Sequence, residues 1–143
     1  MKLDFMMLAN YAEVQNGLLY ISGGTWDTTN VHAPPQGPGV PEGTVAVVQG
    51  TLVARVLFHV TETGRDHGST VSIMDEDGGD VLKIEGGGPV GLQPELPPGW
   101  DQGLNLAVPL TGLTLKKFGR YNISLQIDDQ HVADLPFRVV QRY

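Results

Sequence analysis

The chain has 143 residues, about the length of one domain, and a chain of this size can bury a core without help from disulfides or metals. Its 16 acidic and 9 basic side chains give a formal net charge of −7, which repels phosphate backbones and anionic lipid surfaces. We therefore expect neither nucleic acid nor a membrane as a partner, and the lack of cysteine excludes disulfides, thiolate zinc sites and thiol nucleophiles.

The N-terminal segment, residues 3–14, predicts a strand rather than an export signal. Asp4 interrupts its apolar stretch, and polar residues follow from Asn10 where a signal peptide would keep an unbroken apolar region. We therefore expect a cytoplasmic protein. Asn16-Gly17 next predicts a tight hairpin turn, because both residues tolerate the positive φ that such turns need.

Apolar residues at every second position recur through the chain and predict about eight strands and no helix. The expected strands are 3–14, 18–31, 44–59, 69–75, 80–86, 103–111, 119–128 and 131–140. Gly50, inside the third of these, has no side chain to pack and indicates a bulge or bend. With no internal repeat and no linker, the strands form a single domain over residues 1–143, an all-β antiparallel sandwich.

The last two expected strands have the plainest pattern. The residues expected to face the core are Tyr121, Ile123, Leu125, Ile127, Ala133, Leu135, Phe137 and Val139, and polar residues alternate with the first four of them. A turn at Asp129-Gln130 joins the two strands. One face of this hairpin therefore lies in a core and the other in water.

Two connections, 33–43 and 86–103, are long and rich in glycine and proline, and we expect them to be surface loops. If consecutive strands run antiparallel, the connections alternate between the two ends of the sandwich. The connections expected at one end are 15–17, 60–68, 87–102 and 129–130, and those at the other are 32–43, 76–79 and 112–118.

The polar clusters lack the spacing of catalytic or metal motifs. The run from Asp75 begins like a calcium loop, but Asp80 and Gly86 stand where an EF-hand needs glycine and a bidentate glutamate. The glycines before Pro89 are followed by neither Lys-Ser/Thr nor a helix, so they do not form a phosphate-binding loop. We expect a protein that is not an enzyme and carries no cofactor.

Five residues are candidate contacts for a ligand or a partner: His59, His67, Trp100, Asp101 and His131. The alternation of connections predicts that the three histidines lie near one end of the sandwich. Imidazoles and a carboxylate there could bind a metal or a small ligand if the loops converge. Polar residues are ordinary at strand ends, however, so surface histidines are the preferred interpretation.

The two tryptophans have different settings. Trp26 follows Gly23-Gly24, and the sequence leaves open whether its indole packs in the protein or is displayed. Trp100 lies in the long 86–103 connection, where it either folds back as a plug over the end of the sandwich or is displayed to a partner, and we favour the plug.

The first and third expected strands are apolar on both faces. Phe5 and Met7 lie opposite Met6 and Leu8, and Val53 lies opposite the main apolar set of its strand. Strands of this kind need cover on both faces. Either the Gly/Pro loops or another subunit supplies it, and we favour a homo-oligomer because soluble oligomers are mostly symmetric assemblies of identical chains.

Five segments spread over nearly the whole chain form a combination of motifs. They are Ala9-Asn10-Tyr11-Ala12-Glu13-Val14, Gly17 to Gly24, Pro34-Pro35, Asp75-Glu76-Asp77-Gly78, and the ending from Gly119 to Val140. The combination resembles a bacterial, mainly actinobacterial, family of small immunoglobulin-like sandwiches described only as a domain of unknown function. The resemblance implies an immunoglobulin-like fold and a cytoplasmic setting, and it supplies no catalytic residues. Gly119 and Tyr121 are similar to a tyrosine corner, which would make Tyr121 structural.

From these observations we expect an interaction or accessory subunit that binds a protein partner or itself. The alternative is a small-ligand or metal-binding module at the end that carries His59, His67, His131 and Trp100. Sandwich folds host both classes of function, so the fold does not choose between them.

Overall fold

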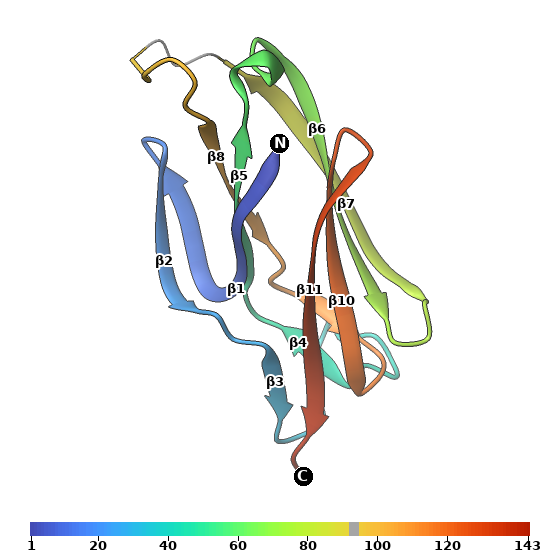
Figure 1. Cartoon of the computed structure of the whole chain (residues 1–143). Coiled ribbons are helices and arrows are strands. Elements are labelled where there is room, and N and C mark those ends of the chain that lie inside the picture. Colours follow the sequence, from blue (N-terminus) through green and yellow to red (C-terminus); the bar gives the residue numbers. More distant parts are fainter. Residues whose placement is uncertain (92–94) are drawn as a thin grey trace.

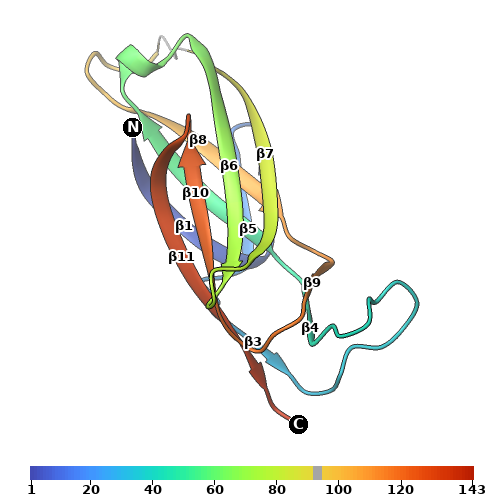
Figure 2. The same cartoon turned by 90° about the vertical axis from the view of Figure 1, so that its right-hand side faces the viewer.

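The protein is an all-β sandwich, as the sequence predicts (Figures 1 and 2). The computed structural model describes residues 1–91 and 95–143. One sheet has the strand order β2-β1-β5-β8, a second has the order β3-β11-β10-β6-β7, and β4 and β9 form a separate two-stranded ladder. The elements are β1 (Lys2–Gln15), β2 (Leu18–Gly24), β3 (Thr28–Val31), β4 (Ala46–Val48), β5 (Thr51–Phe58), the short 3₁₀ helix η1 (Val60–Glu62), β6 (Arg65–Asp75), β7 (Asp80–Val90), β8 (Gln102–Pro109), β9 (Leu113–Leu115), β10 (Gly119–Ile127) and β11 (Gln130–Gln141).

The described strands outnumber the expected ones because two expected strands are each divided between sheets and because β9 lies within the expected connection 112–118. The segment 18–31 becomes β2 and β3, and the segment 44–59 becomes β4 and β5. Gly50 lies at the second division rather than at a bulge. A Cβ atom at this position would come within 2.8 Å of both the Ala9 carbonyl oxygen and the Trp26 ring, so the close approach requires glycine.

Trp26 packs into the sandwich between β2 and β3. Its ring meets Phe137 edge to face, with 6.5 Å between the ring centroids. The tryptophan is therefore packed in the protein, although its buried Nε1 has no hydrogen-bond partner among the residues that the structure describes.

The C-terminal hairpin confirms the predicted alternation. Tyr121, Ile123, Leu125 and Ile127 are buried in the core, as are Phe137 and Val139 on the returning strand. The turn lies one residue earlier than expected, at Asp128 and Asp129, which both have positive φ. The hydroxyl of Tyr121 donates to the Lys117 carbonyl oxygen at 2.7 Å, which confirms the predicted structural role of this tyrosine.

The outer face of the four-stranded sheet is covered by the chain itself. Figure 1 shows β1 turning back on itself near its middle, so that its second half and β2 fold over that face. Ala12 and Leu19 of this hairpin pack with Met7 and Val53 of the sheet, and Asn105 Nδ2 donates to the Gly17 carbonyl oxygen at 2.8 Å. The cover expected from a loop or a second subunit is thus supplied by the β1–β2 hairpin.

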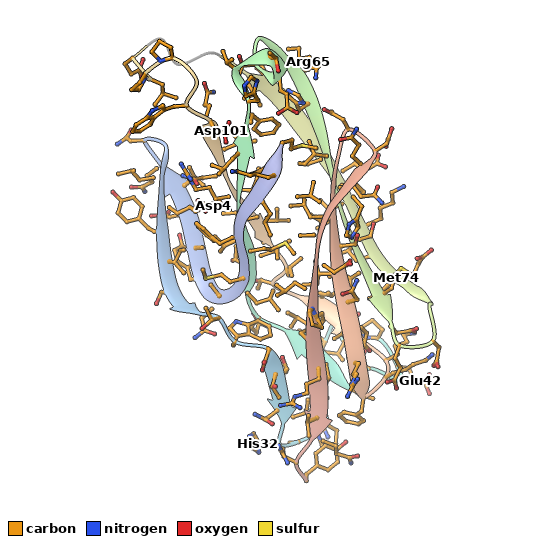
Figure 3. The ribbon with its side chains drawn as sticks, viewed as in Figure 1. Asp4, His32, Glu42, Arg65, Met74 and Asp101 are labelled. Atoms are coloured by element: carbon orange, nitrogen blue, oxygen red, sulfur yellow. The ribbon has the colours of Figure 1, made fainter. Side chains whose placement is uncertain are left out.

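The connections separate into the two expected groups. Figure 3 places Arg65 and Asp101 toward one end of the sandwich and His32 and Glu42 toward the other. The first end carries η1 and the β10–β11 turn, and the second carries the β6–β7 turn (Figure 1). The divided strands change sheet without reversing direction, so the alternation of ends survives the larger number of strands.

Candidate functional site

His67, one of the five predicted contact residues, is buried near the end that carries η1. Its Nδ1 lies 2.5 Å from Asp128 Oδ2, and its Nε2 lies 2.5 Å from the Glu62 carbonyl oxygen. Both partners are acceptors, so each ring nitrogen donates, and only the imidazolium form carries two N–H groups. The ring also packs on Phe58, with 4.8 Å between centroids. This geometry holds His67 in its charged form.

Opposing effects set the pKa of His67. Burial disfavours the charge and by itself would lower the pKa, but the hydrogen bonds to Asp128 and Glu62 and the negative charge of Asp128 outweigh it, so the pKa is raised above 6.5. The hydrogen bond from His67 lowers the pKa of Asp128, whose Oδ1 also accepts from the Gly68 N–H at 2.9 Å. Each side chain therefore favours the charged form of the other.

Glu62 connects this pair to the start of the chain. Its Oε1 accepts from the amino group of Met1 at 2.6 Å and from the His59 N–H at 2.9 Å. The hydrogen bond from the amino group is the main cause of the lowered pKa of Glu62, and the bond from His59 adds to it. The network ties the first strand, η1, β6 and the β10–β11 turn together. Because both nitrogens of His67 donate, this ring can bind a metal only by losing a proton and breaking one of those bonds.

The other four predicted residues do not join His67 at a common site. His59 Nδ1 lies 2.9 Å from Thr61 Oγ1, His131 Nε2 lies 3.0 Å from Asp134 Oδ1, and Asp101 Oδ2 lies 3.7 Å from Lys2 Nζ. Within residues 1–91 and 95–143, no three histidine, aspartate or glutamate side chains are placed to hold a metal ion.

Trp100 is 65% exposed, so the expectation that it plugs the end of the sandwich is wrong. The backbone N–H of Trp100 donates to the Pro97 carbonyl oxygen at 3.2 Å, and Gly99 has a φ of +84°. This turn holds the indole away from the core.

Sequence reasoning did not pair His67 with either Asp128 or Glu62. Asp128 was expected at the end of a hairpin strand, and Glu62 was expected within a loop. The Asp-Asp pair at 128–129 was a usable signal, because aspartate at a turn with positive φ directs its carboxylate toward nearby backbone N–H groups. No local pattern marks Glu62, since it reaches His67 through its backbone carbonyl.

The expected 86–103 loop begins later than predicted, because β7 continues to Val90. Gly86, Gly87 and Gly88 are therefore strand residues paired with β6. Beside them lies a cavity of about 240 Å³, lined by His67, Ser69 and mainly apolar side chains of β5, β7, β8 and β10. His67 therefore belongs both to the hydrogen-bonded network with Asp128 and Glu62 and to the lining of this cavity between β7 and β8.

A family model matches residues 4–140, which is nearly the whole chain. The chain belongs to DUF6941, a family of unknown function. No curated protein matches this DUF6941 chain. A family of unknown function assigns no role to the residues at the His67 end. In the part of this DUF6941 chain that the structure describes, no helix has the length and hydropathy to span a bilayer.

Proposed function

We propose that the protein is a non-enzymatic interaction subunit that pairs with a second copy of itself along the free edge of β2. The observation that carries this proposal is that β2 combines an unpaired edge with exposed apolar side chains on both of its faces.

The edge of β2 is open. This strand is the last in the order of its sheet, with β1 on one side. Among the described residues, no backbone-to-backbone hydrogen bond reaches its other side. A strand edge with free N–H and C=O groups is a template for another strand.

Apolar side chains are exposed on both faces of β2. Leu18 and Tyr20, 60% and 51% exposed, point away from the sheet that the hairpin covers. Ile21, 39% exposed, points toward it. A partner docked on one face would leave the apolar side chains of the other face exposed to solvent, whereas an added strand places its own side chains beside those of β2 on both faces. The distribution favours strand addition.

Two of the other edges, those of β7 and of part of β11, carry residues that oppose pairing. β7 has Asp80, Lys83, Glu85 and Pro89. The part of β11 that β3 does not reach has His131, Asp134 and Pro136. Charges and proline on an edge oppose strand addition. β2 has the sequence LLYISGG, with neither a charge nor a proline.

A second copy fits this edge because the same uncharged strand meets itself. Most surfaces of two molecules with a net charge of −7 repel each other, but two β2 strands do not. Antiparallel pairing of identical strands also satisfies two-fold symmetry, the commonest symmetry of soluble oligomers. A register centred on Tyr20 sets Leu18 opposite Ser22 and Leu19 opposite Ile21 of the second copy.

The substitution Tyr20→Lys tests the proposal. Tyr20 is exposed, so the lysine is tolerated by the fold, but it places like charges against each other at the centre of the paired strands. Light scattering coupled to gel filtration should give the unchanged protein twice its chain mass of 15.4 kDa and the variant the single mass. Hydrogen exchange should show β2 amides that lose protection in the variant.

Met74→Lys is the matched control, because Met74 is an exposed apolar residue of β6 in the other sheet (Figure 3). This variant should keep the double mass. An unchanged protein that runs as a single chain at every soluble concentration contradicts the proposal, and so does a Tyr20→Lys protein that keeps the double mass.

The wider setting belongs to the same proposal. We place the protein in the bacterial cytoplasm and assign its sandwich to the immunoglobulin-like type. The lack of cysteine supports a reducing compartment, and the bond from Tyr121 to the Lys117 carbonyl supports the immunoglobulin-like assignment.

A further inference from the structure

β7 has glycine at two successive positions on its inward face. In the β6–β7 register, Gly86 is opposite Ser69 and Gly88 is opposite His67. Paired residues of antiparallel strands share a face, and His67 is buried against Phe58 on the core side. Gly86 and Gly88 therefore lie on the inward face of β7. Gly88 lines the space between the sheets, whereas Gly86 is exposed.

Neither inward glycine is required by the backbone. Neither has a φ in the left-handed region, and a Cβ atom at Gly88 would meet nothing within 4 Å. At Gly86 the nearest atom would be Ser69 Oγ, at an ordinary 3.7 Å. Gly87 is different, because a Cβ atom there would come within 2.6 Å of the His67 carbonyl oxygen. Glycine weakens a strand, so the sequence keeps this space open at a cost in stability.

The open space is the cavity of about 240 Å³ between β7 and β8. Its apolar walls are Phe58, Pro89, Val90, Leu104, Leu106 and Ile127. An apolar protein cavity of about 150 Å³ is enough to bind benzene. The hollow can therefore take one aromatic ring with a few additional atoms.

The polar atoms of the cavity select a neutral ligand. The Ser69 hydroxyl has no hydrogen-bond partner among the described residues, so it can donate to or accept from a guest. The imidazolium of His67 has both N–H groups committed to Asp128 and Glu62, which leaves its carbon atoms to line the space. Apart from His67, the residues that line the cavity are uncharged. A charged guest would lose its hydration without gaining a counter-charge.

We infer that this cavity is a binding site for a small neutral molecule with one aromatic ring and one polar group that bonds to Ser69. The site goes beyond self-association, because the β2 edge lies on a different strand of the other sheet. It also differs from the expected ligand end, since of the predicted residues it uses His67 alone.

Phenol and benzene are the probes, followed by backbone amide chemical shifts. Both should shift the amides of Gly86, Gly87, Gly88 and Val90 in the unchanged protein. Gly88→Leu fills the cavity with an apolar side chain and should weaken phenol binding at least about tenfold without loss of thermal stability, because the new side chain occupies empty space. Gly88→Ala should also weaken phenol binding, but by a smaller factor. This variant replaces Gly88→Leu in the test if the leucine variant does not fold.

Ser69→Ala separates the polar contact from the apolar walls. It should weaken phenol binding by about three- to tenfold, the value of one neutral hydrogen bond, and leave benzene binding unchanged. Thr70→Leu is the matched control, because the next residue of β6 points to the opposite face of the sheet, and it should leave both probes unaffected.

Two results would overturn the inference. One is a lack of amide shifts at Gly86, Gly87, Gly88 and Val90 with saturating phenol and benzene. The other is a folded Gly88→Leu or Gly88→Ala protein that binds phenol as tightly as the unchanged chain.

Discussion

His67 carries a charge inside the protein, and this makes stability depend on pH. Its pKa is raised on folding, so its contribution is complete below about 6.5 and is lost as the pH rises through the higher folded value. The pKa of Asp128 is lowered, so its contribution is complete above the ordinary value of 3.8 and is lost as the pH falls through the lower folded value. Between these limits the pair is intact.

We predict that His67→Gln removes the alkaline decline. The unchanged protein should lose unfolding free energy as the pH rises from 6 to 9, and the variant should give a flatter profile in urea titrations. At pH 6 the variant should be less stable by about 1.5–3 kcal/mol, nearer the lower figure because Asp128 is partly exposed. His131→Gln, which removes an exposed histidine, should keep the decline. A His67→Gln profile parallel to that of the unchanged protein would contradict the assignment.

The sequence could place His67 but could not reveal its burial. The alternation of connections brings it to the correct end, along with His59 and His131. Its partners come from Asp128, 61 residues away, and from the carbonyl of Glu62. Long-range pairs of this kind depend on how the turns pack, and no spacing rule records them.

At the scale of the element, β7 shows that neighbouring glycines can have different structural roles. Gly87 lets the backbone of β6 approach closely, whereas Gly88 borders open space. A Gly-Gly-Gly-Pro run in a sequence predicts a loop, and here it is the end of a strand.

We predict that Gly87→Ala destabilises the protein by about 1–3 kcal/mol, because the new methyl group overlaps the His67 carbonyl oxygen and forces the two strands apart. Gly88→Ala should change the unfolding free energy by less than about 1 kcal/mol in either direction. Thermal and urea unfolding of the two variants measure the difference. Equal losses in both would show that the close approach at Gly87 is not what sets its identity.

The strands themselves could be predicted because alternation is a local signal. Tyr121, Ile123 and Leu125 follow it without interruption. The passage of a strand from one sheet to another could not be predicted, since Gly50 as a bend and Gly50 as a crossing point look the same in sequence. The bend in β1 is hidden for the same reason, and it supplied the cover that we had expected from a loop or another subunit.

At the scale of the whole molecule, charge governs the proposed self-association. Two chains of net charge −7 repel each other over about 30 Å at 0.01 M salt and over about 8 Å at 0.15 M. We predict that added sodium chloride tightens the dimer, because the contact itself is uncharged and only the surrounding repulsion is screened. Sedimentation at several salt concentrations measures this. A dimer that dissociates as salt rises would indicate a contact held by ion pairs instead of the β2 edge.

The pairing of β3 with β11 has a consequence for how the chain reaches its native state. These strands run parallel and join Thr28–Val31 to Arg138–Gln141, so some 110 residues separate the partners. Contacts between such distant segments form slowly, because closing the long intervening loop costs chain entropy before the contacts can stabilise the structure. During synthesis β3 must wait for almost the entire polypeptide to emerge from the ribosome, and β10 is likewise without its β11 neighbour until then. A nascent chain that stalls before residue 130 would present both as open edges, which makes this interval the time at which a chaperone would have most to protect.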